Sequence, residues 1–233
     1  MAEKILVVDD NKSICEILEF NLSNEGYNVE CAYSAEEALE KLTSQHALIL
    51  LDVMMGEMSG YKMAEKLRKE KRSVPIIFLT AKDTENDMLT GFSVGADDYI
   101  AKPFSIKEVI ARVKALLKRS EITQKGGTET VPEKGKLIFD DVAINLDTKE
   151  LIIENEILPL TRTEFEIITL LASNPSRIFE RDEMIDHIWK DSPYITERTV
   201  DVHIGRLRKK LGNKASLIVS RPGYGYRFND SAK

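Results

Sequence analysis

Polar residues able to do chemistry stand at the ends of short apolar runs in the first half of the chain. In an open parallel sheet the carboxyl ends of the strands meet at one edge, where ligands bind near a topological switch point. Carboxylates gathered there repel each other unless a hard cation neutralises them, and oxygen ligands favour Mg²⁺. A carboxylate beside Mg²⁺, with a hydroxyl and an ammonium group nearby, is a candidate phosphoryl acceptor. The residues at these strand ends are Asp9, Asp10, Asp52, Thr80 and Lys102.

The apolar runs alternate with amphipathic segments as far as residue 119. Runs at 5–8, 48–51 and 76–79 are typical of strands buried on both faces, and weaker strands are expected at 27–33 and 98–101. Helical patterns lie between them at 12–25, 35–44, 59–70, 84–94 and 105–119. Ser34 with Glu37, and Ser105 with Glu108, form capping-box patterns at two helix starts. This alternation predicts an α/β fold for residues 1–119, a doubly wound domain with a five-stranded parallel sheet.

The composition changes after that domain. Residues 120–135 contain Gly126-Gly127 and Pro132 and few large apolar residues, which predicts a flexible linker. Short strand patterns then cluster at 136–160, helical patterns follow at 162–173, 181–189 and 196–211, and two short strands lie around 217–220 and 226–228. A small sheet, three helices and a terminal hairpin predict an α+β winged-helix domain over residues 136–233.

The net charge of −6 conceals a basic C-terminal segment. Residues 196–233 hold 9 basic and 3 acidic residues, a net charge of +6 that is typical of a polyanion-binding site. Because no apolar run approaches the ~20 residues of a membrane span and no signal peptide precedes the first strand, we expect a cytoplasmic protein without a membrane partner. Cys15 and Cys31 lack the number and spacing of a disulfide framework or a metal site, and we expect free buried thiols.

The helix predicted at 196–211 has two distinct faces. At 100° per residue an apolar stripe is expected to pack on the domain, and the opposite face carries cations around an apolar valine. Such a valine suits a thymine methyl group, and an arginine suits a guanine edge or a phosphate. Basic residues in the tail could grip the DNA backbone. The candidate DNA contacts are Arg198, Thr199, Val202, His203, Arg206, Lys209, Lys210 and Arg221.

Residues 3–119 resemble the receiver domain of two-component response regulators, on the strength of the acidic and polar residues at the strand ends. The resemblance implies that Asp52 is phosphorylated, that Asp10 binds Mg²⁺ directly and Asp9 binds it through water, and that Met54 contributes its backbone carbonyl. It further implies that Thr80 hydrogen-bonds the phosphoryl group, that Lys102 pairs with it, that Tyr99 reorients with Thr80, and that the Lys102-Pro103 peptide is cis. One departure is Gly56, where the family usually has proline.

Residues 136–228 resemble the OmpR/PhoB-type winged-helix effector domain. Three segments carry the resemblance: LTRTEF at 160–165, RTVDVHIGRLRKK at 198–210 and GYGYRF at 223–228. It implies that the helix at 196–211 enters the major groove, that the hairpin reaches the minor groove, and that the loop at 190–195 touches RNA polymerase. Gly205 stands where many relatives carry a basic contact, and Pro222 replaces a common cation of the hairpin.

Together the two resemblances imply a phosphorylation-controlled transcription factor, a phosphoacceptor and not an enzyme. A sensor histidine kinase would phosphorylate Asp52, two receivers would pair through charges that include Asp98, Glu108 and Arg112, and the dimer would bind tandem sites on double-stranded promoter DNA. A nearby alternative is a DNA-binding regulator whose receiver works without phosphorylation. An aspartyl-phosphate hydrolase is disfavoured because Met54 stands where such enzymes have a second acid.

Overall fold

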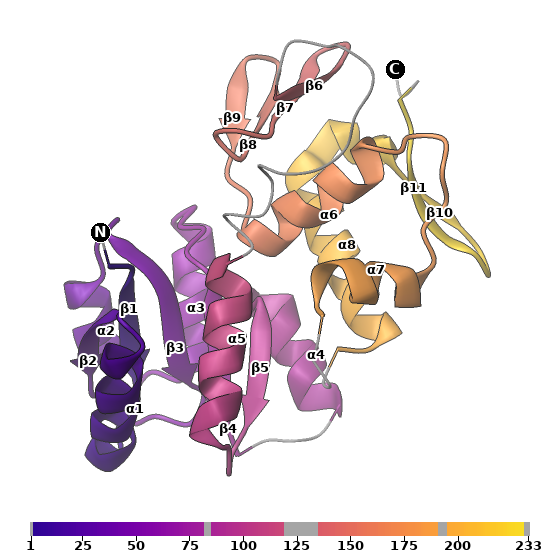
Figure 1. Cartoon of the computed structure of the whole chain (residues 1–233). Coiled ribbons are helices and arrows are strands. Elements are labelled where there is room, and N and C mark those ends of the chain that lie inside the picture. Colours follow the sequence, from indigo (N-terminus) through magenta and orange to yellow (C-terminus); the bar gives the residue numbers. More distant parts are fainter. Residues whose placement is uncertain (1, 82–84, 119–134, 191–194, 231–233) are drawn as a thin grey trace. The chain divides into compact units, whose positions relative to one another are not determined.

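The computed structural model describes residues 2–81, 85–118, 135–190 and 195–230 (Figure 1). The chain divides into two compact units, Met1–Ser120 (the N-terminal unit) and Glu121–Lys233 (the C-terminal unit). Almost all of the linker predicted at 120–135 lies outside the described residues. Within the described ranges, no helix combines the length and apolar character needed to cross a membrane.

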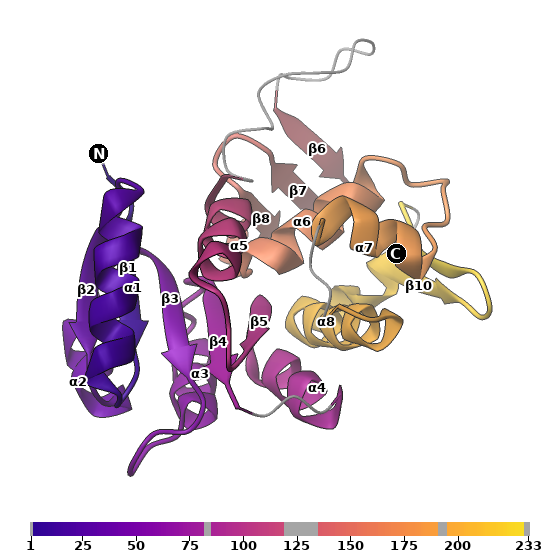
Figure 2. The same ribbon diagram turned by 60° about the horizontal axis from the view of Figure 1, so that its bottom comes forward.

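The N-terminal unit is built on a five-stranded parallel sheet of order β2-β1-β3-β4-β5 (Figure 2). The strands are β1 (Lys4–Val8), β2 (Asn28–Ala32), β3 (His46–Asp52), β4 (Ile76–Thr80) and β5 (Asp98–Ala101). The helices are α1 (Lys12–Asn24), α2 (Ala35–Lys41), α3 (Gly60–Lys69), α4 (Glu85–Val94) and α5 (Ile106–Lys118). The doubly wound fold expected from the sequence is confirmed.

Both faces of this sheet are covered, which explains the uninterrupted apolar runs of its central strands. On one face Ile5 and Val7 of β1 belong to a buried cluster with α1 and α5, and Leu6 and Val8 are equally inaccessible to solvent on the other. Helices α2, α3 and α4 are packed in sequence, α2 against α3 and α3 against α4. A strand buried on both faces needs apolar residues at every position and not at alternate positions.

Local sequence sets the starts of the helices. Ser34 caps α2 by accepting a hydrogen bond from the Glu37 N–H, but the Glu37 carboxylate accepts from the Tyr33 N–H and not from Ser34 itself. The capping box expected there is therefore only half formed. Helix α2 also ends at Lys41, three residues before the predicted end, because the backbone of Leu42 is extended.

The C-terminal unit begins with a four-stranded antiparallel sheet, β6-β7-β8-β9, and ends in a two-stranded hairpin. The first four strands are β6 (Lys136–Phe139), β7 (Val142–Asn145), β8 (Glu150–Ile153) and β9 (Glu156–Leu158). Three helices follow, α6 (Arg162–Ala172), α7 (Arg181–Ile188) and α8 (Glu197–Leu211). A 3-10 turn, Gly212–Leu217, leads into β10 (Ile218–Arg221) and β11 (Gly225–Phe228). This arrangement confirms the predicted winged-helix architecture.

Candidate metal centre and nucleic-acid interface

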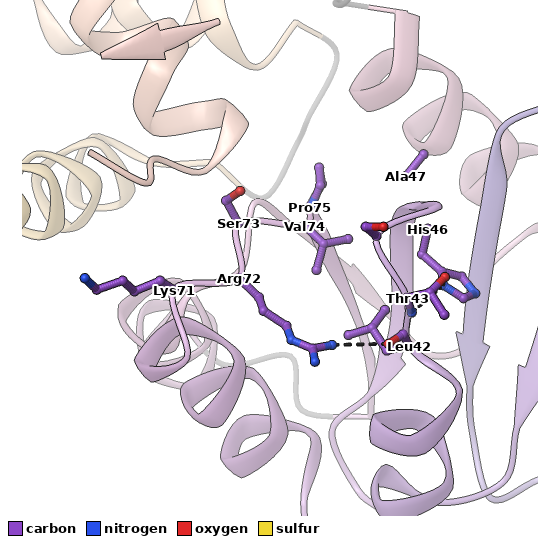
Figure 3. A pocket seen from close by; sticks show the side chains of 10 residues that line it. Leu42, Thr43, His46, Ala47, Lys71, Arg72, Ser73, Val74 and Pro75 are labelled. Carbon is purple, nitrogen blue, oxygen red and sulfur yellow. Dashed lines mark hydrogen bonds between the residues drawn. The ribbon is translucent and has the colours of Figure 1, made fainter. Parts of the chain in front are cut away.

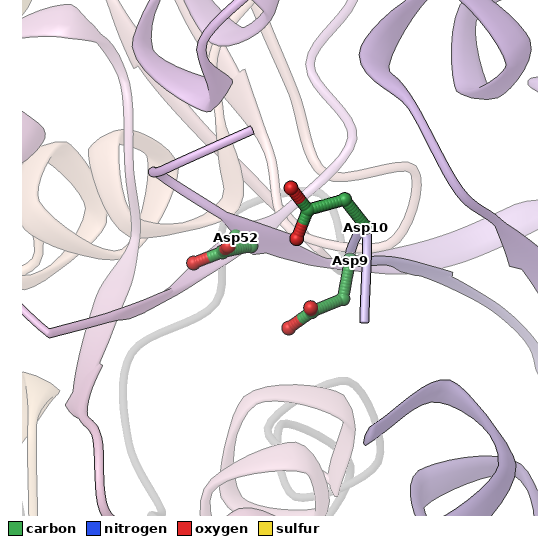
Figure 4. A group of neighbouring side chains, drawn as sticks. All are labelled: Asp9, Asp10 and Asp52. Carbon is green, nitrogen blue, oxygen red and sulfur yellow. The ribbon is translucent and has the colours of Figure 1, made fainter. Parts of the chain in front are cut away.

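The three carboxylates singled out in the sequence meet at one edge of the parallel sheet. Asp9 follows β1 and Asp52 ends β3, and these strands are neighbours, so their carboxyl ends lie side by side. One carboxylate oxygen from each of Asp9, Asp10 and Asp52 lies within 4.8 Å of the other two (Figure 4). Asp9 and Asp52 are buried, whereas Asp10 is exposed to solvent. One side of the cluster therefore remains open to an incoming group.

An ammonium group fixes the two buried acids. Lys102 Nζ lies 2.7 Å from Asp9 Oδ2 and 3.1 Å from Asp52 Oδ1, and it comes from the end of β5 across the sheet. The other carboxylate oxygen of Asp9 accepts a hydrogen bond of 2.9 Å from the Asn11 N–H. Asp9 is thus held from both sides, which orients its carboxylate before any ligand arrives.

The electrostatics of the cluster favour an added cation. Burial raises the pKa of the Asp52 carboxyl, and the Lys102 ammonium offsets this only in part. Burial also acts to lower the pKa of Lys102, but its hydrogen bond to Asp9 and the charges of Asp9 and Asp52 outweigh this and raise it. One ammonium group thus faces three carboxylates, so the cluster keeps an excess of negative charge. These oxygen-only donors fit Mg²⁺.

Close packing behind Asp52 was not anticipated from the sequence. A Cβ atom on Gly60, the first residue of α3, would lie 2.1 Å from the backbone oxygen of Asp52, so only glycine fits there. Gly60 N–H also donates to the Val53 carbonyl oxygen at 3.1 Å. The signal available was the helix start at Ser59-Gly60, where Ser59 caps α3. Met54 lies between these residues with an exposed side chain, and its expected carbonyl ligation stays a prediction.

The remaining predicted residues of the site lie on β4 and β5. Thr80 is fully buried at the end of β4, and its backbone oxygen accepts a hydrogen bond of 2.6 Å from the Lys102 N–H. Tyr99 is also fully buried and packs its ring against Phe78 and Phe92. The Lys102-Pro103 peptide is cis, as expected. The structure therefore brings Thr80 and Lys102 together at the edge that carries the acidic cluster.

The charges expected to pair two receivers are paired within the chain. Arg112 Nη1 lies 3.1 and 3.0 Å from the two carboxylate oxygens of Asp98, and Arg112 Nη2 lies 3.2 Å from Glu108 Oε1. Only 5% of the Arg112 side chain is exposed. An intermolecular role for these residues requires this network to exchange partners, and it stays a prediction.

Helix α8 presents the expected faces. Val200, Ile204, Leu207 and Leu211 are buried against the C-terminal unit, as predicted. The opposite face is exposed or partly exposed to solvent and carries Arg198, Val202, Gly205, Arg206 and Lys209. In the hairpin, Arg221 is exposed and the side chain of Tyr224 is 65% exposed. These side chains form one candidate surface for nucleic acid.

Two candidate DNA contacts are buried, and this contradicts their expected role. The Thr199 hydroxyl oxygen accepts a hydrogen bond of 3.3 Å from the Thr196 N–H, which ties it to the start of the helix. His203 packs against Trp189 with 5.1 Å between ring centroids, and its burial lowers its pKa well below the ordinary value. We therefore remove Thr199 and His203 from the DNA-binding surface. At 100° per residue His203 lies about 40° and Thr199 about 80° from Leu207, at the edge of the apolar stripe, too close for helical periodicity to separate a buried position from an exposed flank.

Glu164 of α6 engages two further candidate contacts. The carboxylate is completely buried, and it lies 3.1 Å from Arg206 Nη2 and 2.6 Å from Lys210 Nζ. Burial acts to raise the pKa of Glu164, but the charges of Arg206 and Lys210 outweigh it and lower the pKa. Glu164 also completes a capping box with Thr161 at the start of α6. A second role for a capping glutamate leaves no mark in the sequence.

A pocket lies at the opposite edge of the parallel sheet from the acidic cluster (Figure 3). Its walls come from the residues before β3 and before β4, and Arg72 crosses it to donate a hydrogen bond of 3.2 Å to the Leu42 carbonyl oxygen. His46, on the same wall, lies 3.2 Å from Glu30 Oε2. The polar groups of Arg72 and His46 are thus paired within the protein.

Comparison with known proteins agrees with both halves of the chain. Residues 5–114 match the family model "Response regulator receiver domain", and residues 154–228 match "Transcriptional regulatory protein, C terminal". The alkaline phosphatase synthesis transcriptional regulatory protein PhoP of Bacillus subtilis is 41% identical over 99% of this chain and 98% of its own length. The uncharacterized transcriptional regulatory protein YclJ of the same organism is 38% identical, and the match covers 97% of this chain and 99% of YclJ.

Solved structures give the same result. The response regulator DrrB of Thermotoga maritima, described as an OmpR/PhoB homologue, is 30% identical and has a TM-score of 0.52, covering 98% of this chain and 100% of its own. A mutant of RitR is 26% identical and has a TM-score of 0.77, and the match covers 98% of this chain and 99% of the RitR chain. The similarity therefore extends over both units and not over one of them alone.

Proposed function

Because this chain belongs to the OmpR/PhoB family of response regulators, we propose that Asp52 accepts a phosphoryl group from a sensor histidine kinase. As a member of this family it is a two-component transcriptional response regulator. The observation that carries the proposal is the clustering of Asp9, Asp10 and Asp52 with the Lys102 ammonium at the carboxyl edge of the sheet.

The chemistry of phosphoryl acceptance follows from the contacts of Asp52. A carboxylate oxygen of Asp52 attacks phosphorus, the bond between phosphorus and the donor's histidine nitrogen breaks, and the electron pair stays on that nitrogen. Lys102, already 3.1 Å from Asp52, stabilises the negative charge that develops on the phosphoryl oxygens. Thr80, at the end of the neighbouring strand, is the proposed hydrogen-bond donor to the bound phosphoryl group.

Mg²⁺ is the proposed cofactor of this step. Asp10, Asp52 and the backbone carbonyl of Met54 would hold it directly, and Asp9 would hold it through water. When bound, the ion neutralises the excess negative charge of the acidic cluster and of the phosphoryl oxygens. Asp9 is the acid least free to approach the ion, because Lys102 and Asn11 already hold its carboxylate.

We propose that phosphorylation controls transcription by promoting dimerisation of the receiver and binding of the dimer to DNA. Phosphorylation would shift Thr80 and Tyr99, and the adjacent surface of α4, β5 and α5 would pair two receivers through Asp98, Glu108 and Arg112. The exposed face of α8 would then enter the major groove of double-stranded promoter DNA and the hairpin would reach the minor groove. The proposed location for this role is the cytoplasm.

Contact with RNA polymerase is proposed for the loop at 190–195. Residues 191–194 of that loop lie outside the described residues, so the support comes only from the family resemblance. A receiver that works without phosphorylation is the alternative, and the assembled acidic cluster argues against it.

Incubation with a small acyl phosphate tests the phosphoacceptor proposal. Mass spectrometry of the full chain should show one added phosphoryl group in the presence of Mg²⁺, and none with a chelator or in the variant Asp52→Asn. Glu57→Gln, at an exposed position in the loop after β3, is the control and should be phosphorylated normally. Undiminished incorporation in Asp52→Asn would refute the assignment.

A further inference from the structure

The only two cysteines among the 233 residues lie in contact, although they are 16 positions apart. Cys15 is in the first turn of α1 and Cys31 is in β2, and these elements pack against each other. Cys31 Sγ lies 3.8 Å from the backbone oxygen of Cys15, and the two thiols interact directly. Both are free thiols; Cys15 is fully buried and Cys31 is partly exposed. One sulfur is therefore accessible to a reagent and the other is placed to react with it.

This thiol pair contacts the acidic cluster. The Cys15 S–H donates a hydrogen bond of 3.3 Å to the backbone oxygen of Asp9. The side chain of Asp9 in turn holds Lys102, and Asn11, two residues after Asp9, caps α1. Oxidation of Cys15 would therefore affect the loop that carries Asp9 and Asp10, because the S–H donor to the Asp9 backbone oxygen would be lost.

We propose that Cys15 and Cys31 form a reversible intramolecular disulfide when a peroxide is present, and that this disulfide slows phosphorylation of the receiver. The first half of the proposal rests on the contact between the thiols alone. The second half rests also on the proposed function, because it assumes that the cluster beside Cys15 accepts a phosphoryl group.

The oxidation proceeds in two balanced steps. The sulfur of Cys31 attacks one oxygen of the peroxide, the O–O bond breaks, and one water leaves as Cys31 becomes a sulfenic acid. The sulfur of Cys15 then attacks the sulfur of Cys31, the S–O bond breaks, and a second water leaves as the disulfide forms. In total the two thiols lose two electrons and two protons, and the peroxide takes up both.

An acidic neighbour offers a test of the first step. The contact with Cys15 and burial raise the pKa of the Cys31 thiol, and the Glu19 carboxylate, with Oε2 3.8 Å from Cys31 Sγ, raises it further and so disfavours the reactive thiolate. Replacement of this carboxylate, Glu19→Gln, should therefore speed disulfide formation several-fold. Glu16→Gln, at an exposed position of the same helix, is the matched control and should leave the rate unchanged.

The disulfide is measured in the full chain by exposure to hydrogen peroxide, alkylation of the remaining thiols and peptide mass mapping without reductant. The expected product is a peptide pair joined through Cys15 and Cys31, with two hydrogens lost, that dithiothreitol restores to thiols. Cys31→Ser should abolish it and is the preferred control, because Cys15 is buried and its replacement risks the fold. Recovery of both cysteines as alkylated thiols, or of Cys31 oxidised beyond sulfenic acid, would overturn the proposal.

The coupling is measured by comparing the phosphorylation rate of reduced and oxidised protein with an acyl phosphate. We expect the oxidised protein to react several-fold more slowly, with full recovery after reduction and no effect of peroxide on Cys31→Ser. Equal rates would overturn the coupling while the disulfide stands. Absence of phosphorylation in the reduced protein would instead overturn the proposed function, and so the two failures are distinguishable.

Discussion

Loss of the Glu164 charge is expected to destabilise the C-terminal unit strongly. The variant Glu164→Gln keeps the shape of the side chain and an oxygen able to accept the 2.8 Å hydrogen bond from the Thr161 N–H. It removes the negative charge that Arg206 and Lys210 share at 3.1 and 2.6 Å. Breaking a buried ion pair at one partner costs about 3–5 kcal/mol, because the other charge is left uncompensated.

The lower end of that range is expected here. Side-chain exposures of 13% for Arg206 and 26% for Lys210 allow partial hydration of the stranded cations, so we expect a loss of about 3 kcal/mol in the free energy of unfolding. A matched control is Glu166→Gln on the same helix, which loses the ion pair with Arg162. That pair is closer to solvent and should be worth less than about 1 kcal/mol.

The chain's one tryptophan provides the assay. Trp189 is buried in the C-terminal unit beside His203, so its fluorescence during urea denaturation of the full chain reports that unit alone. Glu164→Gln should lower the midpoint without changing the slope m. A double-mutant cycle with Arg206→Gln should show that the two single losses are not additive. A loss below about 1 kcal/mol, equal to that of Glu166→Gln, would refute the reasoning.

Acid should abolish the difference between wild type and Glu164→Gln. Burial acts to raise the pKa of Glu164, but Arg206 and Lys210 hold it below the ordinary value of 4.5. A carboxylate with a depressed pKa in the folded state contributes stability above its unfolded-state pKa, and this contribution is lost as pH falls through the folded-state pKa. The two denaturation midpoints should thus converge below pH 4.5. A difference that stays constant into that range would contradict the charge argument.

Three further outcomes are expected. Lys209→Ala should reduce the slope of the logarithm of the DNA-binding constant against the logarithm of salt concentration by about one. Lys210→Ala should leave this slope nearly unchanged, because the Lys210 ammonium is bound to Glu164 within the protein. Equal slopes for the two variants would count against the proposed surface. Gly60→Ala should lower thermal stability and phosphoryl incorporation because its Cβ would meet a backbone oxygen at 2.1 Å, whereas Gly56→Ala, with nothing within 4 Å, should be tolerated in both assays. Gly205→Arg should raise affinity for most duplexes in a binding titration, since its Cβ also meets nothing within 4 Å; a loss of binding would mean that the helix backbone approaches DNA closely.

Much of the fold and of the acidic site could be predicted from local sequence. Apolar runs of strand length alternating with amphipathic helices leave few topologies other than a doubly wound sheet, because parallel strands need crossover helices on both faces. Once that sheet is accepted, Asp9 and Asp52 must lie at the same edge, since all parallel strands of a sheet end there. Only the strand order, which makes β1 and β3 neighbours, brings the two carboxylates together. The apolar stripe of α8, from Val200 to Leu211, likewise follows from helical periodicity.

Only the tertiary structure decided which charged and polar side chains meet across elements. Helical periodicity predicts the face on which Arg206 or Arg112 lies. It does not predict which residue of another helix or strand binds the side chain, because such contacts depend on packing between elements. Arg206 therefore proved to be bound to Glu164, and Arg112 to Asp98. His203 was expected to contact DNA, yet the ring of Trp189, which follows α7, packs against it and its side chain is fully buried. Local sequence thus determines the face of the helix on which a side chain lies, and packing against another segment determines whether that side chain is exposed to solvent or buried.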